Sequence, residues 1–133
     1  MAVIDKNVID SLIRSASDML AANGDGDNHT VAASIYTADG ALYTGMNLYH
    51  FTGGPCAEVV ALARLTSDGG GAPLAVVAVG DNGRGVLAPC GRCRQILADY
   101  CPEVQVILMA EGEPSAKPLS DLIPYTYFWA EHQ

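Results

Sequence analysis

Apolar residues recur at steps of three and four in the first part of the chain. Between Asp5 and Ala22 the apolar positions are Val8, Ile9, Leu12, Ile13, Ala16, Met19 and Leu20. This spacing places them on one face of a helix. Asp5 can cap the start of that helix, and the segment NGDG that follows the helix is a signal for its end. The pattern predicts an amphipathic helix over residues 5–22.

The next two segments are predicted to be strands joined in a hairpin. HTVAASIY (29–36) and ALYTGMNLY (41–49) lie on either side of the pair Asp39–Gly40. An Asp-Gly pair supports the positive φ that tight hairpin turns need. The glycines and proline of FTGGP interrupt the second strand, and a helix is predicted from Cys56 to Leu65.

The second half of the chain alternates between strand and helix patterns. LAVVAVG (74–80) is a continuous apolar strand, of the kind that helices cover on both faces. CGRCRQILADY (90–100) is a predicted helix, VQVILM (104–109) a buried strand and YTYFW (125–129) an extended aromatic segment. The alternation without internal repeats predicts one α/β domain over 1–133, a three-layer α/β/α sandwich with a mixed sheet of about five strands.

Composition and charge narrow the classes of partner. A net charge of −8 with only seven Lys and Arg residues argues against a nucleic-acid partner, because such affinity comes largely from cations that neutralise phosphates. No apolar run approaches the ~20 residues that cross a bilayer, so no membrane partner is expected. The start MAVIDKNVID lacks a secretory signal, which predicts a cytoplasmic protein whose four cysteines are reduced and free to bind metal.

Three cysteines and one glutamate gather at two predicted helix starts. Cys90 and Cys93 have the C-x-x-C spacing that lets two sulfurs reach one zinc ion, and Cys56 adds a third ligand from another helix start. Free N–H groups at helix N-termini favour the thiolate. Three protein ligands leave the fourth position of zinc to water, which is typical of catalytic sites. Glu58 can point toward that position and move protons while it stays unligated.

The same residues admit other interpretations. A structural zinc site could be completed by Cys101, although Cys101 follows the end of the helix that Cys90 begins. A redox dithiol formed by Cys90 and Cys93 leaves Cys56 and Glu58 without a role. Glu58 could also be a solvated helix residue. A non-catalytic, zinc-stabilised module is therefore the alternative from a different class.

The order CAE followed by PCGRC resembles the signature of zinc deaminases. The chain is similar to the cytidine deaminase superfamily, and NLYHFTGGPCAEVVAL, GRGVLAPCGRCRQIL and LIPYTYFW are most similar to its blasticidin S deaminase branch. The resemblance implies a cytidine deaminase-like fold, one Zn²⁺ per subunit and loss of the C4 amine of a cytosine ring as ammonia. Glu58 would carry a proton to N3 and then to the leaving amine. The implied substrate is blasticidin S or a similar cytosine nucleoside, with cytidine and deoxycytidine of pyrimidine salvage as the alternative.

The resemblance also assigns substrate contacts. Asn47 keeps the family's asparagine, but Tyr49 stands where the family has a glutamate that accepts from a ribose hydroxyl. This change matches the blasticidin branch, whose substrate carries a sugar acid. Arg84 suits the carboxylate of that acid, because a guanidinium fork pairs bidentately with such a group. The remaining implied contacts are Thr30, Ala57, Tyr127 and Trp129, while the family's aromatic residue in the first strand is missing from HTVAASI.

The supporting residues also have plain structural interpretations. Asn47 could bond backbone at a strand end, Arg84 could be a solvated charge, and the aromatics Tyr127 and Trp129 could serve the core or a subunit contact. The histidines show no ligand spacing and are interpreted as surface or hydrogen-bonded side chains: His29, His50 and His132.

Charge balance at the zinc site adds one more candidate. Three thiolates leave the site with a net negative charge, which weakens the Lewis acidity of the ion. Helix N-termini offset part of that charge, and Arg92, between two ligands, is predicted to offset the rest. Typical small cytidine deaminases have a small residue at that position and an arginine directly after CAE, where this chain has Val59. The substitution matches the blasticidin branch. It also implies a homotetramer with sites near the subunit junctions.

Overall fold

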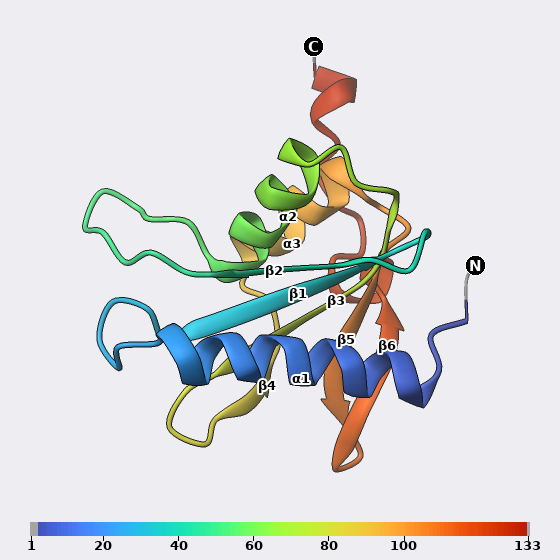
Figure 1. Cartoon of the computed structure of the whole chain (residues 1–133). Helices are drawn as coiled ribbons and strands as arrows, with labels where there is room; N and C mark the ends of the chain where they lie inside the picture. Colours follow the sequence, from blue (N-terminus) through green and yellow to red (C-terminus); the bar gives the residue numbers. More distant parts are fainter. Residues whose placement is uncertain (1–2, 133) are drawn as a thin grey trace.

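The fold is built on a mixed six-stranded sheet, which a computed structural model shows for residues 3–132 (Figure 1). The side chain of His132 lies outside this described part. The elements are α1 (Lys6–Asn23), β1 (Val31–Thr37), β2 (Leu42–Met46), α2 (Ala57–Ser67), β3 (Pro73–Gly80), β4 (Gly85–Leu87), α3 (Gly91–Tyr100), β5 (Gln105–Ala110), β6 (Glu113–Pro118), α4 (Leu119–Leu122) and the 3₁₀ helix η1 (Trp129–His132). Among these described elements, no helix has the length and apolarity that crossing a membrane requires.

The sheet has the strand order β2-β1-β3-β5-β6, and the short β4 pairs with β3. β3 runs antiparallel to β1 and parallel to β5. The apolar run of residues 74–80 thus lies in the central strand, as its continuous hydrophobic pattern predicts.

Helices cover both faces of the sheet (Figure 1). On one face, Val76 and Ala78 of β3 pack with residues of α2 and α3. On the other face, the alternate residue Val77 packs with Leu12 and Ala16 of α1. The predicted three-layer α/β/α sandwich is confirmed, because successive residues of β3 point into the two opposite layers.

The first helix begins and ends close to the predicted residues. Asp5 is its N-cap, and Asp5 Oδ1 accepts the Val8 N–H at 2.9 Å. The backbone N–H of Gly24 donates to the Leu20 carbonyl at 2.8 Å and ends the helix. Local capping signals therefore sufficed to place this element.

Strand β6 and the shape of the tail differ from the sequence prediction. β6 has the sequence EPSAKP, whose two prolines and few apolar residues are untypical of a strand. It forms as an edge strand paired antiparallel to β5. The segment YTYFW is not extended throughout, because Tyr125 has φ 54° in a turn and η1 begins at Trp129. Both features depend on neighbours that are distant in sequence.

Gly45 lets β2 and α2 approach closely. A Cβ at this position would lie 2.7 Å from Val60 Cγ1 and 2.9 Å from the Ala61 backbone nitrogen. We expect Gly45→Ala to lower the free energy of unfolding by about 1–3 kcal/mol, because α2 must move away from the sheet. The control is Gly91→Ala, whose Cβ meets nothing within 4 Å. Thermal unfolding of both variants measures the difference, and equal midpoints would contradict this account of the packing.

Candidate metal centre

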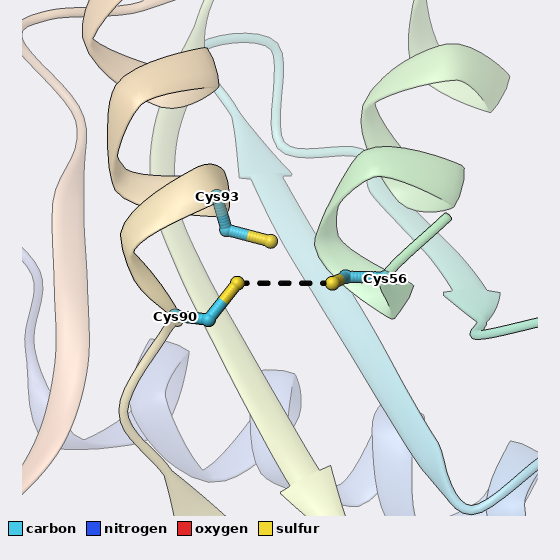
Figure 2. Close-up of side chains that lie close together, drawn as sticks. All are labelled: Cys56, Cys90 and Cys93. Carbon is cyan, nitrogen blue, oxygen red and sulfur yellow. Dashed lines mark hydrogen bonds between the residues drawn. The ribbon is translucent and has the colours of Figure 1, made fainter. Parts of the chain in front are cut away.

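Three thiols converge where α2 and α3 begin (Figure 2). Cys56 and Cys90 are the N-cap residues of α2 and α3, and Cys93 lies in the first turn of α3. All three Sγ atoms lie within 4.8 Å of one another, and the Cys56 and Cys90 sulfurs are 3.8 Å apart. Two sulfurs at 2.3 Å from a tetrahedral zinc are separated by about 3.8 Å. The donor set and its spacing therefore fit one zinc ion.

The ligand segments enter the helices in the same way. Cys56 has φ −71° and ψ 160°, and Cys90 has φ −70° and ψ 169°, so both are extended N-cap residues. Each follows a proline, Pro55 or Pro89, whose own φ is fixed near about −65° and so limits the conformations of the segment that leads into the helix. The two N-caps hold the sulfurs at the starts of two helices that cover the same face of the sheet.

Burial makes two of the three thiols, Cys56 and Cys93, reluctant to ionise without a cation. It raises the pKa of the Cys56 thiol, and it also raises that of Cys93, where the charge of Glu58 adds to the effect. Burial acts the same way on Cys90, but the backbone N–H groups of Cys93 and Arg92 and the neighbouring thiols outweigh it and lower the pKa of Cys90. A bound cation favours the thiolate form, so the cluster suits a metal more than a redox pair.

Glu58 lies beside the thiols in the first turn of α2 and is only 6% exposed. Burial raises the pKa of its carboxyl, while its own backbone N–H and the Cys93 thiol act in the opposite direction. A carboxyl group with a raised pKa can both take and return a proton near neutral pH. Glu58 is thus not a solvated helix residue.

A cavity of about 180 Å³ opens onto this group. Its wall includes Cys56, Cys90, Glu58 and Asn47, and the remaining lining is mostly small and apolar: Val31, Ala57, Ala78, Leu87 and Ala88. The chemically active groups therefore share one small apolar recess, which is the arrangement expected of a site for a flat ring.

Asn47 bonds backbone N–H groups and also lines the cavity. Its Oδ1 accepts the backbone N–H groups of Thr30 at 2.8 Å and Val31 at 3.0 Å, and the residue also lines the cavity. Because both partners are donors, the amide oxygen must face them. The side-chain NH₂ is the group left for a ligand.

The other expected substrate contacts lie less close to the sulfurs. Ala57 lines the cavity, but Thr30, Tyr49, Arg84, Tyr127 and Trp129 are not among its lining residues in the described chain. Tyr49, Tyr127 and Trp129 are more than half exposed. Arg84 donates to the Thr30 carbonyl at 2.9 Å and pairs with Asp81 Oδ1 at 2.8 Å. Arg84 is therefore engaged by the protein, and is not a free solvated charge.

Arg92 and Cys101 lie outside the cluster of thiols. Arg92 Nη1 donates a long 3.4 Å bond to the carbonyl of Gly54, two residues before the first ligand. Cys101 is the C-cap of α3, at the opposite end of the helix from Cys90, and burial raises the pKa of its thiol to about 11. No fourth sulfur belongs to the group within the described residues.

Two residues with contacts to the site carried no signal in the sequence. Arg94 donates to the Pro89 carbonyl at 2.9 Å and to the Leu122 carbonyl at 2.8 Å, and so ties the ligand loop to α4. His29 Nδ1 bonds the Asn47 carbonyl at 2.9 Å. Their partners are backbone carbonyls, which every residue has, so no residue pattern could reveal these bonds.

Comparison with known proteins gives consistent results. Residues 6–109 match the family model described as the cytidine and deoxycytidylate deaminase zinc-binding region. The chain is 27% identical over 125 residues to blasticidin-S deaminase of Bacillus cereus, covering 87% of this chain and 89% of that protein. It is 36% identical over 96 residues to a cytidine deaminase of Mycobacterium tuberculosis, covering 71% and 69%.

Solved structures resemble the fold over most of its length. The cytidine deaminase from Bacillus anthracis has a TM-score of 0.77 at 25% identity and covers 95% of this chain and 94% of its own. The cytidine deaminase from Mycobacterium leprae has a TM-score of 0.72 at 31% identity, with coverage of 86% and 96%.

Proposed function

This chain belongs to the cytidine and deoxycytidylate deaminase family, and we propose that it removes the C4 amine of blasticidin S or a similar cytosine nucleoside. The family and the thiol cluster make it a zinc-binding deaminase. The observation that carries the proposal is the buried carboxyl of Glu58 in one cavity with two of the three thiols.

Cys56, Cys90 and Cys93 would hold the zinc, since their sulfurs have a matching separation. When bound, zinc supplies a water nucleophile near neutral pH by lowering the pKa of water toward about 7. Arg92 would balance part of the thiolate charge from the first turn of α3, where its guanidinium lies near Gly54. The roles of the three cysteines are those that the family resemblance implies, whereas the role of Arg92 rests on charge balance.

Glu58 would move the protons of the reaction. Its carboxylate takes a proton from the attacking water and delivers it to N3 of the ring as the new C–O bond forms at C4. It then takes the proton of the new C4–OH group and transfers it to the amine, so that the C4–N bond breaks, the C4 carbonyl forms and ammonia leaves. Proton transfer by a positioned group of matched pKa contributes typically 10²–10⁴-fold to a rate, and burial gives Glu58 that raised pKa.

The rest of the cavity would orient the substrate. Small side chains such as Ala57 and Ala78 leave room for a ring, and the NH₂ of Asn47 can donate to an oxygen of the sugar. Arg84 already pairs with Asp81. It could bind a carboxylate of the substrate only in addition to this pair or in place of it. Thr30, Tyr49, Tyr127 and Trp129 would contact the substrate only outside this recess. The family resemblance implies these contacts, and we place them outside the recess because none of the four lines it.

The choice of blasticidin S over cytidine rests on coverage and on one substitution. The match to blasticidin-S deaminase extends over 87% of this chain, against 71% for the cytidine deaminase match. Tyr49 also replaces the glutamate that reads ribose. Cytidine is the second candidate, because the identity to a cytidine deaminase is higher, at 36% against 27%.

A substrate panel on zinc-loaded protein tests the proposal. Ultraviolet assays would give kcat/KM for blasticidin S, cytidine and deoxycytidine under the same conditions. We expect blasticidin S to be preferred at least about tenfold, the effect of about 1.4 kcal/mol in transition-state binding. A preference for cytidine would reverse the ranking, and absence of turnover on all three with full zinc would support the non-catalytic module.

Assembly and location remain predictions from the sequence. We propose a single-domain homotetramer in the cytoplasm, without a nucleic-acid or membrane partner. Support for assembly comes from large exposed apolar side chains, including Phe51, Phe128 and Trp129. Sedimentation analysis of the zinc-loaded protein would test the number of subunits.

A further inference from the structure

Asp25 organises the loop between α1 and β1, residues 24–30. Its Oδ1 accepts three successive backbone N–H groups, from Asp27 at 2.9 Å, Asn28 at 2.9 Å and His29 at 2.8 Å. The Asp25 N–H donates to the His29 carbonyl at 3.2 Å and closes the loop. The N–H groups of His29 and Asp27 are the main reason that the pKa of the Asp25 carboxyl is lowered, so the acceptor stays ionised.

The closed loop presents His29 to the cavity wall. His29 Nδ1 lies 2.9 Å from the Asn47 carbonyl, and its Nε2 lies 4.0 Å from Asp25 Oδ2. A carbonyl only accepts, so Nδ1 carries the hydrogen and donates it. His29 therefore links Asp25 to Asn47, because its backbone N–H donates to Asp25 Oδ1 and its ring donates to the Asn47 carbonyl.

Thr30 and Val31, which follow His29 in the chain, also hold Asn47 by hydrogen bonds. The Thr30 and Val31 N–H groups donate to Asn47 Oδ1, and the Asn47 N–H donates to the Val31 carbonyl at 3.1 Å. The backbone N–H of Tyr49 donates to the Asn28 carbonyl at 3.1 Å. The backbone and the side chain of Asn47 are thus held by residues 29–31, at the end of the loop that Asp25 closes and at the start of β1.

We propose that Asp25 and His29 are positioning residues for the substrate: they hold the start of β1 against Asn47, so that Asn47 presents its NH₂ to the cavity. The ligand atom that meets Asn47 must then be an acceptor. This inference rests on the proposed function for its effect on turnover, because Asn47 has to contact the substrate. The arrangement itself can be measured without turnover.

Loss of Asp25 should perturb binding more than folding. Its carboxylate is 43% exposed, and the loop contributes no residue to either core cluster. Asn47 would touch a part of the substrate that does not react, and loss of such a contact raises KM more than it lowers kcat. A lost hydrogen bond in this setting corresponds to about 5- to 30-fold in affinity.

The experiment compares four variants as zinc-loaded full chains. For the best substrate of the panel, Asp25→Ala and His29→Ala should raise KM about 5- to 30-fold with kcat within about threefold. Asp25→Asn should stay within about threefold of wild type, because an amide oxygen also accepts N–H bonds. Asp27→Ala removes a carboxylate from the same loop and should leave KM within about twofold. Zinc content should be unchanged in all four.

Two further measurements separate this inference from the proposed function. In an Asn47→Ala background, Asp25→Ala should add little to KM, because coupled residues are not additive. In nuclear magnetic resonance spectra, Asp25→Ala and His29→Ala should shift the side-chain amide signal of Asn47, while Asp27→Ala should not. If wild type turns over no substrate, the proposed function fails and the amide signal still decides this inference. Unchanged KM together with an unchanged amide signal would overturn it.

Discussion

Glu58→Gln is expected to reduce kcat on the best substrate by about 10²–10⁴-fold. The amide has nearly the shape of the carboxylate, but it can neither take a proton from water nor return one to the ring. Because Glu58 is not among the clustered thiols, zinc should remain at one ion per chain. The fold should persist as well, since a neutral side chain replaces a buried carboxyl whose ionisation is disfavoured.

The decisive measurement is kcat at a verified zinc content. Glu103→Gln serves as the matched control, since Glu103 is an exposed glutamate next to Pro102, beyond the end of α3. It should keep kcat within about twofold of wild type. Activity of Glu58→Gln within tenfold of wild type would rule out the proton-transfer role, and loss of its zinc would mean that the carboxylate belongs to the metal site.

Cys93→Ala is expected to empty the metal site and lower stability together. Cys93 is the most deeply buried of the three clustered thiols, at 1% exposure. With two ligands left, zinc content should fall from one ion to below about 0.1 per chain, because structural and catalytic sites need at least three protein ligands. The bound metal stabilises the native state by about 2.7 kcal/mol at a hundredfold excess over Kd, and the variant loses this contribution.

Cys101→Ala is the control for that experiment, because Cys101 is also a buried cysteine of the same helix region. It should lose only packing, on the order of 1 kcal/mol, and keep its zinc. Metal analysis and thermal unfolding with and without a chelator would measure both effects. The chelator should lower the midpoint of wild type and Cys101→Ala but not that of Cys93→Ala. Loss of zinc from Cys101→Ala would instead support the alternative interpretation, a structural zinc site with four sulfurs.

Local signals predicted the parts of the fold that depend on short stretches of chain. The spacing of apolar residues located α1 to within one residue at each end, and Asp5 caps it as expected. The continuous run of β3 indicated a strand between two layers. The polar strand β6 was missed because its pairing with β5, and not its own composition, makes it a strand.

In the candidate site, too, some features follow from a short stretch of chain and others depend on distant partners. The C-x-x-C spacing brings Cys90 and Cys93 into one helical turn, so their proximity is a local property of the chain. Asn47 was predicted at a strand end, but its orientation depends on the N–H groups of Thr30 and Val31. Residue types alone do not reveal which of its amide atoms faces a ligand.

The sequence by itself determined the helix starts, the alternation of layers and the four residues that can perform metal-assisted proton transfer, because each is encoded within a few neighbouring positions. The sequence also predicted that Cys56 joins the thiol of Cys90, 34 residues away, but only the tertiary structure gave their separation. It alone decided that Arg84 is already paired and that His29 reaches Asn47. These contacts join segments that the fold of the sheet and its loops brings together. Their geometry depends on how the layers pack, and backbone partners leave no trace in the pattern of side chains.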